Sequence, residues 1–200
     1  MTEPDRAAPA LERALVAAAG AERGHFAYES GHHGDLWLNL DALFLDARRV
    51  RDWAAALARS AARCRAELVC GPLTGGAFLA QAVAAELGAS FLFAERLASA
   101  GEAVQYRVPA ALRRELDRKR VLLVDDAVNA GSALLSTLSD VLACGAEVTG
   151  FACLITLGGA AGDVARQEGV PLHTLASLER GMWTPAECPL CRSGVPLAAT

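Results

Sequence analysis

The segment from Val121 to Leu135, VLLVDDAVNAGSALL, constrains the fold of this chain more than any other part of the sequence. Four consecutive apolar residues, Val121 to Val124, are typical of a short strand buried in a parallel sheet. Two adjacent carboxylates, Asp125 and Asp126, follow directly. A turn of small residues then leads into apolar residues at helical spacing, which predicts a helix from about Ser132. The segment therefore predicts a strand, a loop and a helix, the repeating unit of an α/β fold.

The same loop has the chemistry of a sugar-phosphate site. Its backbone N–H groups and the N-terminus of the following helix favour a bound phosphate. At neutral pH the carboxylates of Asp125 and Asp126 only accept hydrogen bonds. They can accept them from two neighbouring hydroxyls, as on a ribose, or hold a hard cation directly or through water. The alternative is an ordinary turn in which the acids cap the sheet and Ser132 caps the helix.

A second loop, Gly71-Pro72-Leu73-Thr74-Gly75-Gly76, lies between another predicted strand and helix. Glycines allow the backbone to approach an anion, and the Thr74 hydroxyl adds a donor. Strand-to-helix turns often contain glycine, so this loop alone is a weak signal. Paired with the acidic loop, it predicts the second anion site that a sugar pyrophosphate requires.

The rest of the chain alternates predicted strands and helices. Strands are expected at 68–70, 91–94, 121–124, 148–157 and 172–175, with an edge strand at 104–108. Helices are expected at 9–19, 48–65, 75–87 and 132–144. This alternation predicts an α/β fold with a mainly parallel central sheet and helices on both faces. The loops at the carboxyl ends of its strands should converge on one crevice.

Length and composition limit the class of protein. Two hundred residues with 53% hydrophobic and 21% charged residues predict one domain with a well-filled core, here residues 9–200 after a disordered segment 1–8. The net charge of −4 argues against a nucleic-acid partner. The sequence has neither an apolar run long enough to span a membrane nor the pattern of a signal peptide. We therefore expect a cytoplasmic protein with no membrane or nucleic-acid partner.

The six cysteines do not suggest a disulfide framework. Four lie in or beside apolar segments and are expected to be small core residues: Cys64, Cys70, Cys144 and Cys153. Cys188 and Cys191 form a C-x-x-C pair, which is half of a zinc site. Because no second pair and no nearby histidine pair accompanies them in the sequence, we expect a structural or accidental pair rather than a metal site.

Taken together, these features resemble orotate phosphoribosyltransferases, a branch of the type I phosphoribosyltransferases, along most of the chain. The acidic loop is similar to the signature of the whole type I family. The orotate branch is indicated by GHFAYESGHHGDLWLNLDALF and by the tail PAECPLCRSGVPL. The resemblance implies the type I fold with a small hood, formed by residues of about 24–46 as a hairpin and by the C-terminal tail. It also implies a homodimer in which a mobile loop reaches the neighbouring subunit.

The activity implied by the resemblance is transfer of ribose 5-phosphate from phosphoribosyl pyrophosphate to a nucleobase nitrogen, with release of pyrophosphate. Mg²⁺ is the implied cofactor, held indirectly by Asp125 and Asp126 through ribose hydroxyls or water. The 5′-phosphate would lie on Asn129, Ala130, Gly131, Ser132 and Ala133, and the pyrophosphate on Leu73, Thr74, Gly75 and Gly76. Arg96 and Arg107 complete the implied catalytic set with the two aspartates.

The expected base pocket consists of Glu29, His32, Asn129 and Gly159, and it departs from the family pattern in charge. Glu29 stands where a lysine is usual, and Gly158 or Gly159 stands where an arginine is usual. His32 can contact a base or supply charge when protonated, although a solvated turn histidine is commoner. Without a cation the pocket would bind orotate poorly, because a desolvated carboxylate needs a counter-charge.

Two alternatives to an orotate enzyme therefore stay open. One is an enzyme of the same fold that acts on a less anionic base. The other is a regulatory protein that binds phosphoribosyl pyrophosphate but has little or no turnover.

Overall fold

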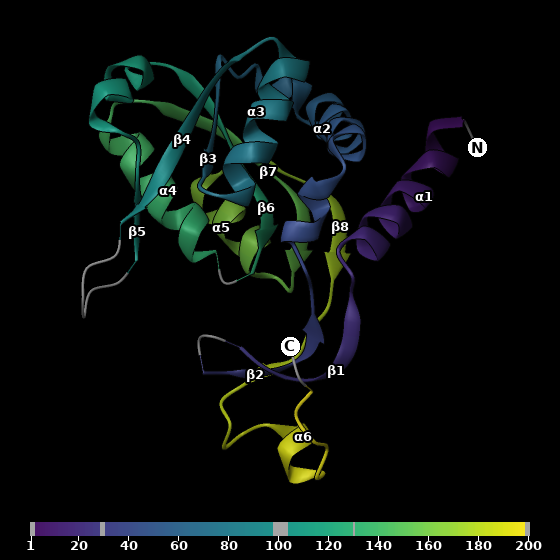
Figure 1. Cartoon of the computed structure of the whole chain (residues 1–200). Coiled ribbons are helices and arrows are strands. Elements are labelled where there is room, and N and C mark those ends of the chain that lie inside the picture. Colours follow the sequence, from purple (N-terminus) through teal and green to yellow (C-terminus); the bar gives the residue numbers. More distant parts are fainter. Residues whose placement is uncertain (1–2, 29–30, 98–103, 130, 199–200) are drawn as a thin grey trace.

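A six-stranded sheet forms the centre of the computed structural model, which describes residues 3–28, 31–97, 104–129 and 131–198. The strand order is β5-β4-β3-β6-β7-β8. The strands are β3 (Leu68–Pro72), β4 (Ser90–Leu97), β5 (Gln105–Arg107), β6 (Arg120–Val128), β7 (Glu147–Leu157) and β8 (Leu172–Leu178). All neighbours pair in parallel except β5, which runs antiparallel to β4 at the edge. This arrangement confirms the predicted α/β fold (Figure 1).

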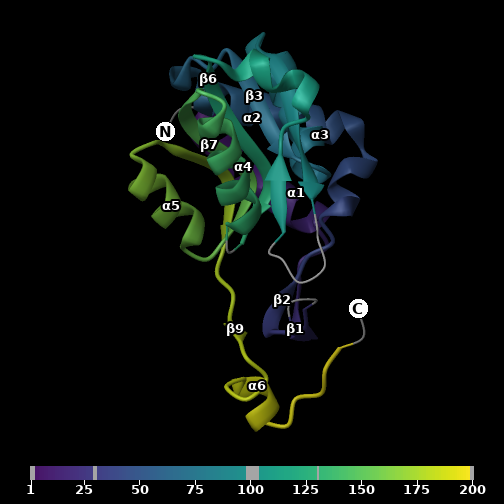
Figure 2. The ribbon, with the colours of Figure 1, turned by 90° about the vertical axis from the view of Figure 1, so that its left-hand side faces the viewer.

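Helices cover both faces of this sheet. Leu122 and Val124 of β6 belong to one hydrophobic core, together with residues of α1 (Glu3–Ala18), α2 (Ala47–Ala61) and α3 (Gly75–Leu87). Val121 and Leu123 belong to the other core, with residues of α4 (Ser132–Ala143) and α5 (Ala160–Glu168). Successive side chains of a strand point to opposite faces. The uninterrupted apolar run in β6 is therefore explained by burial on both sides, and Figure 2 shows α3 and α5 on opposite sides of the sheet.

A second, three-stranded sheet joins the two ends of the chain. β1 (Glu22–Ala27) pairs antiparallel with β2 (His33–Trp37), which confirms the predicted hairpin. β2 also pairs with β9 (Met182–Trp183) of the C-terminal tail, and the short helix α6 (Pro189–Arg192) follows. In Figure 1 this small sheet and α6 lie below the six-stranded sheet. Three 3₁₀ segments complete the described elements: η1 (Asp41–Leu45), η2 (Ala62–Cys64) and η3 (Ala110–Leu116).

α1 and α5 differ from the sequence prediction, and the short helix α6 was not predicted either. α1 begins at Glu3, so residues 3–8 are helical where we expected disorder and a start at Pro9. Pro4 lies in the first turn, where a missing N–H costs no helical hydrogen bond. α5 was not predicted, because its glycine-rich start weakens the helical pattern. It buries Ala161, Val164 and Ala165 in the core, so packing stabilises it. Over the described ranges, no helix combines the length and the apolar character needed to cross a membrane.

Candidate active site

The two carboxylates lie inside β6, because this strand continues past them to Val128. Asp125 is 7% exposed. Its Oδ1 accepts a hydrogen bond from the N–H of Asp126 at 3.0 Å, and Oδ1 of Asp126 accepts one from the N–H of Ala127 at 2.7 Å. Among the described residues, neither carboxylate takes part in an ion pair. The buried Asp125 and the half-buried Asp126 therefore lie side by side, and neither is paired with a cation of the described residues.

Burial has a direct consequence for their protonation. It raises the pKa of Asp125 well above the usual range, and the negative charge of Asp126 raises it further. Burial also raises the pKa of Asp126. The charged pair is thus unfavourable in the free protein. Ligand hydroxyls or a hard cation would stabilise it.

The glycine-rich loop packs directly against these carboxylates. A Cβ atom at Gly75 would overlap Oδ2 of Asp126, and a Cβ at Gly76 would lie 2.6 Å from Oδ1 of Asp125. Only glycine leaves room for the acids at these two positions. The predicted convergence of the two loops is therefore present in the structure.

Both helices that begin at the site lack a side-chain cap. α3 follows Thr74, whose hydroxyl accepts no capping hydrogen bond, and α4 follows Gly131, which has no side chain to offer. By contrast, Asp46 caps α2 by accepting hydrogen bonds from two first-turn N–H groups. Ser132 is the first residue of α4, so the alternative in which Ser132 caps this helix is wrong. The uncapped helix ends leave N–H groups and positive dipole ends available to anions.

A cavity of about 360 Å³ lies over the acidic loop. Its lining includes Asp125, Asn129, Gly131, Ser132 and Ala133, together with His32 and Met182 from the segments of the hood. Ala130 falls outside the described residues. Nδ1 of His32 is buried and has no hydrogen-bond partner among the described residues. The half-buried His32 therefore brings a polar atom to the cavity.

Arg180 is a cation that sequence reasoning missed. It donates a hydrogen bond from Nη2 to Oδ1 of Asn129, and its guanidinium carbon lies 5.3 Å from the centroid of the Tyr28 ring. Arg180 and Asn129 both line a neighbouring hollow of about 290 Å³, with Tyr28, Trp37 and Met182. Arg180 therefore places a cation beside Asn129, one of the predicted base-pocket residues. Arg180 lies two residues after the carboxyl end of β8. Because ligands bind beyond the carboxyl ends of parallel strands, this position is the signal that could have marked Arg180 as a site residue.

One of the other two predicted base-pocket residues, Gly159, lies elsewhere. Gly159 is the N-cap residue of α5 and lines neither hollow. Glu29 falls outside the described residues. Of the four predicted residues, the structure brings His32 and Asn129 to the same cavity.

Arg96 and Arg107 lie on the β4–β5 edge and do not line the cavity over the acids. Arg107 donates to Oε1 of Gln105 at 2.8 Å on its own strand. The segment between β4 and β5, residues 98–103, falls outside the described residues. The catalytic roles of the two arginines stay predictions.

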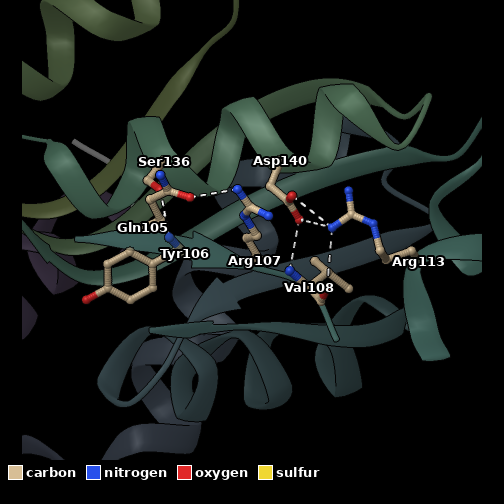
Figure 3. A network of polar contacts seen from close by, with 7 residues as sticks. All are labelled: Gln105, Tyr106, Arg107, Val108, Arg113, Ser136 and Asp140. Carbon is tan, nitrogen blue, oxygen red and sulfur yellow. Dashed lines mark hydrogen bonds and ion pairs between the residues drawn. The ribbon is translucent and has the colours of Figure 1, made fainter. Parts of the chain in front are cut away.

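Polar contacts hold β5 against α4 (Figure 3). The N–H of Tyr106 donates to Oγ of Ser136 at 2.7 Å, and the N–H of Val108 donates to Asp140 at 2.9 Å. Arg113 donates to both carboxylate oxygens of Asp140, at 2.7 and 2.8 Å. These contacts fix the base of the loop that separates β4 from β5.

The C-x-x-C pair has two histidines beside it, which we did not expect from the sequence. Cys188 and Cys191 lie beside His25 and His33, and the potential ligand atoms of all four are within 4.8 Å of one another. The prediction that no histidine pair accompanies the two cysteines is wrong, because the fold brings β1 and β2 against the tail.

Comparisons with known proteins agree with this geometry. A family model described as the phosphoribosyl transferase domain matches residues 37–172. The orotate phosphoribosyltransferase of Caldanaerobacter subterraneus subsp. tengcongensis is 32% identical over 178 residues, which cover 88% of this chain and 87% of that protein.

Solved structures share the fold at lower identity. The orotate phosphoribosyltransferase of Aeropyrum pernix superposes with a TM-score of 0.65 at 23% identity, over 84% of this chain and 93% of that one. The adenine phosphoribosyl transferase of Trypanosoma brucei also gives 0.65, at 18% identity, over 84% of this chain and 79% of that one. Structural likeness alone therefore does not distinguish the base.

Proposed function

This chain belongs to the phosphoribosyl transferase domain family, and on that basis we propose that it forms orotidine 5′-phosphate from orotate and phosphoribosyl pyrophosphate. In this reaction a ring nitrogen of orotate bonds to C1 of the ribose as the bond from C1 to the pyrophosphate oxygen breaks, and the proton of that nitrogen is released with the pyrophosphate. The observation that supports orotate as the base is the hydrogen bond that Arg180 donates to Asn129 in the hollow beside the cavity. A guanidinium there can pair with the orotate carboxylate.

Phosphoribosyl pyrophosphate would bind across the two uncapped helix ends. We assign its 5′-phosphate to the N–H groups of residues 129–133 before and within α4, and its pyrophosphate to residues 73–76 before α3. The ribose hydroxyls would donate to Asp125 and Asp126. Binding in this way relieves the cost of the two buried charges, because each carboxylate gains donors in place of lost water.

The donor set also fits Mg²⁺, because two adjacent carboxylates, one buried and one half-buried, present the oxygen ligands that this ion prefers, and neither forms an ion pair among the described residues. Asp125 and Asp126 would hold it indirectly, through ribose hydroxyls or water. When bound, Mg²⁺ would offset negative charge on the departing pyrophosphate.

The protein's own contribution is positioning and charge. As the bond to pyrophosphate breaks, C1 gains positive character, and the carboxylates beneath the ribose stabilise it. Arg180 and the amide of Asn129 would orient the base, and the free Nδ1 of His32 would hydrogen-bond to it. No nucleophilic side chain is needed.

The proposal includes a homodimer in the cytoplasm. Arg107, which does not line the cavity over the acids of its own chain, would act in the partner's site together with the loop that precedes β5. Six free thiols are in keeping with a reducing compartment.

The test is steady-state formation of orotidine 5′-phosphate by the purified protein with Mg²⁺, compared with a panel of uncharged bases. For Arg180→Met, we expect kcat/KM for orotate to fall by about 10- to 100-fold, the cost of losing a charge-assisted hydrogen bond of roughly 1.5–3 kcal/mol. Arg48→Gln, on the exposed face of α2, is the matched control and should behave as wild type.

Two results would contradict the proposal. One is an orotate rate that Arg180→Met leaves unchanged. The other is turnover of an uncharged base in preference to orotate, which would assign the site to that base.

A further inference from the structure

Four metal-binding side chains meet where the tail crosses the hairpin, away from the cavity of the acidic loop. His25 lies on β1, His33 on β2, and Cys188 and Cys191 on the turn that contains α6 (Figure 1). Nε2 of His25 is 3.0 Å from Nδ1 of His33, 3.4 Å from Sγ of Cys188 and 3.6 Å from Sγ of Cys191. Sγ of Cys191 is 3.2 Å from Nδ1 of His33.

These separations are close to those around a tetrahedral zinc ion. With usual Zn–N and Zn–S bond lengths, two nitrogen ligands lie about 3.3 Å apart, and a nitrogen and a sulfur about 3.6 Å apart. The observed N–N distance of 3.0 Å and N–S distances of 3.2–3.6 Å differ from these by a few tenths of an ångström. All four ligand atoms also lie within 4.8 Å of one another, so the arrangement is compatible with one ion between them.

A further contact prepares one histidine for metal binding. Nδ1 of His25 lies 2.7 Å from the carbonyl oxygen of Val195. A proton on Nδ1 donates to that carbonyl and leaves the Nε2 lone pair directed at the cluster. Ligating histidines usually have such a partner for their other nitrogen, because it fixes the tautomer and the ring.

Burial suits a structural ion. Cys188 is fully buried and His25 is 2% exposed, whereas Cys191 is exposed and gives an ion access. Two thiolates and two imidazoles complete a four-ligand shell and leave no position for a substrate.

We propose that His25, His33, Cys188 and Cys191 bind one structural Zn²⁺ that fastens the C-terminal tail to the hairpin. The ion would reinforce backbone contacts between the hairpin and the tail, which include the β2–β9 pairing and the hydrogen bond from the N–H of Ala198 to the carbonyl oxygen of His25. His32 precedes the ligand His33 in sequence, and Met182 pairs with Gly34 in the small sheet, so the ion would lie next to segments that line the cavity.

The test is metal content of the full-length protein, purified reduced and equilibrated with Zn²⁺. We expect one zinc ion per chain that survives gel filtration, and visible d–d and thiolate charge-transfer bands when Co²⁺ replaces it. Cys191→Ser and His33→Gln should each weaken Zn²⁺ binding at least tenfold, since even the loss of an outer-shell partner typically costs about 10- to 100-fold. Cys144→Ser, which removes a thiol elsewhere in the chain, is the control and should retain the ion.

Substoichiometric zinc in the reduced wild-type protein would overturn the proposal, as would Co²⁺ bands that persist in Cys191→Ser. Both ligand variants alter partly or fully exposed residues, and circular dichroism shows whether they are folded. Because the readout is metal content and Co²⁺ absorption, the result is independent of whether orotate is the substrate.

Discussion

The acidic loop and the four-residue His/Cys cluster place ligand-binding side chains together by different routes. Asp125, Asp126 and the start of α4 follow one another along the chain, so one strand, one turn and one helix arrange them. In the cluster, by contrast, His33 meets Cys191 across 158 residues and His25 meets Cys188 across 163. The first kind of site can be identified from consecutive residues. The second exists only after the small sheet has formed.

The two regions also differ in what they cost the free protein. The buried aspartates make it less stable until a ligand binds. The side chains of the cluster are already within hydrogen-bond distance of one another in the free protein. We therefore expect changes at the acidic loop to affect ligand affinity most, and changes at the cluster to affect the fastening of the tail.

The largest effect is expected for Gly75→Ala. Its new Cβ would overlap Oδ2 of Asp126 and displace either the carboxylate or the loop. A displacement of about 1 Å at a catalytic group can lower activity about 100-fold, so we expect at least that loss in kcat/KM. Gly162→Ala, in α5, is the control: its Cβ would come no nearer than 3.4 Å to a flexible arginine side chain. Wild-type activity in a folded Gly75→Ala protein would show that the two loops do not act together.

Asp126→Asn should weaken binding of magnesium phosphoribosyl pyrophosphate by one to two decades. Loss of a charged acceptor typically costs about 1.5–3 kcal/mol, and each 1.4 kcal/mol is about tenfold. Isothermal titration calorimetry is the measurement. Asp163→Asn, which removes an exposed partner of Arg166, should leave affinity unchanged. Equal affinities for both variants would make Asp126 a structural residue.

Asp125→Asn should weaken ligand binding yet stabilise the ligand-free protein. The pKa of Asp125 is raised in the folded state, so the folded protein binds more protons than the unfolded chain. Stability of the wild type should then fall as pH rises from the unfolded value, about 4, through the raised folded pKa.

The asparagine variant should lack this fall and should have the higher Tm at neutral pH. About 1 kcal/mol corresponds to roughly 2–4 °C in Tm for a chain of this size. Thermal unfolding of both proteins without ligand, across a pH series, is the measurement. A lower Tm for Asp125→Asn at neutral pH would mean that the carboxylate is stabilised in the free protein.

The smallest effect is expected when the proposed zinc ion is removed from the wild-type protein with a chelator and the affinity for phosphoribosyl pyrophosphate is then measured. Removal of zinc should change affinity for phosphoribosyl pyrophosphate less than about twofold, because no cluster residue lines the cavity. Hydrogen exchange in β2 and β9 should become faster, since the tail loses its fastening. A tenfold loss of affinity on chelation would show that the two regions are coupled.

Much of the fold could be predicted because it depends on local patterns. The apolar run of β6, the start of α4 at Ser132 and the range 75–87 of α3 are as the sequence indicates. α5 could not be predicted, since burial of Val164 and Ala165 rather than intrinsic propensity stabilises it.

Within the candidate site, the sequence by itself determined the acidic loop and the glycine loop. Strand period, turn residues and helix starts are set by neighbours along the chain, and parallel strands bring their carboxyl ends to one edge. Only the tertiary structure decided that Arg180 lies on Asn129 and that two histidines face Cys188 and Cys191. Those contacts depend on strand order and on how the tail packs against the hairpin. No pattern of adjacent residues predicts these contacts. Burial of apolar surface brings the segments together, and those segments are far apart in the sequence.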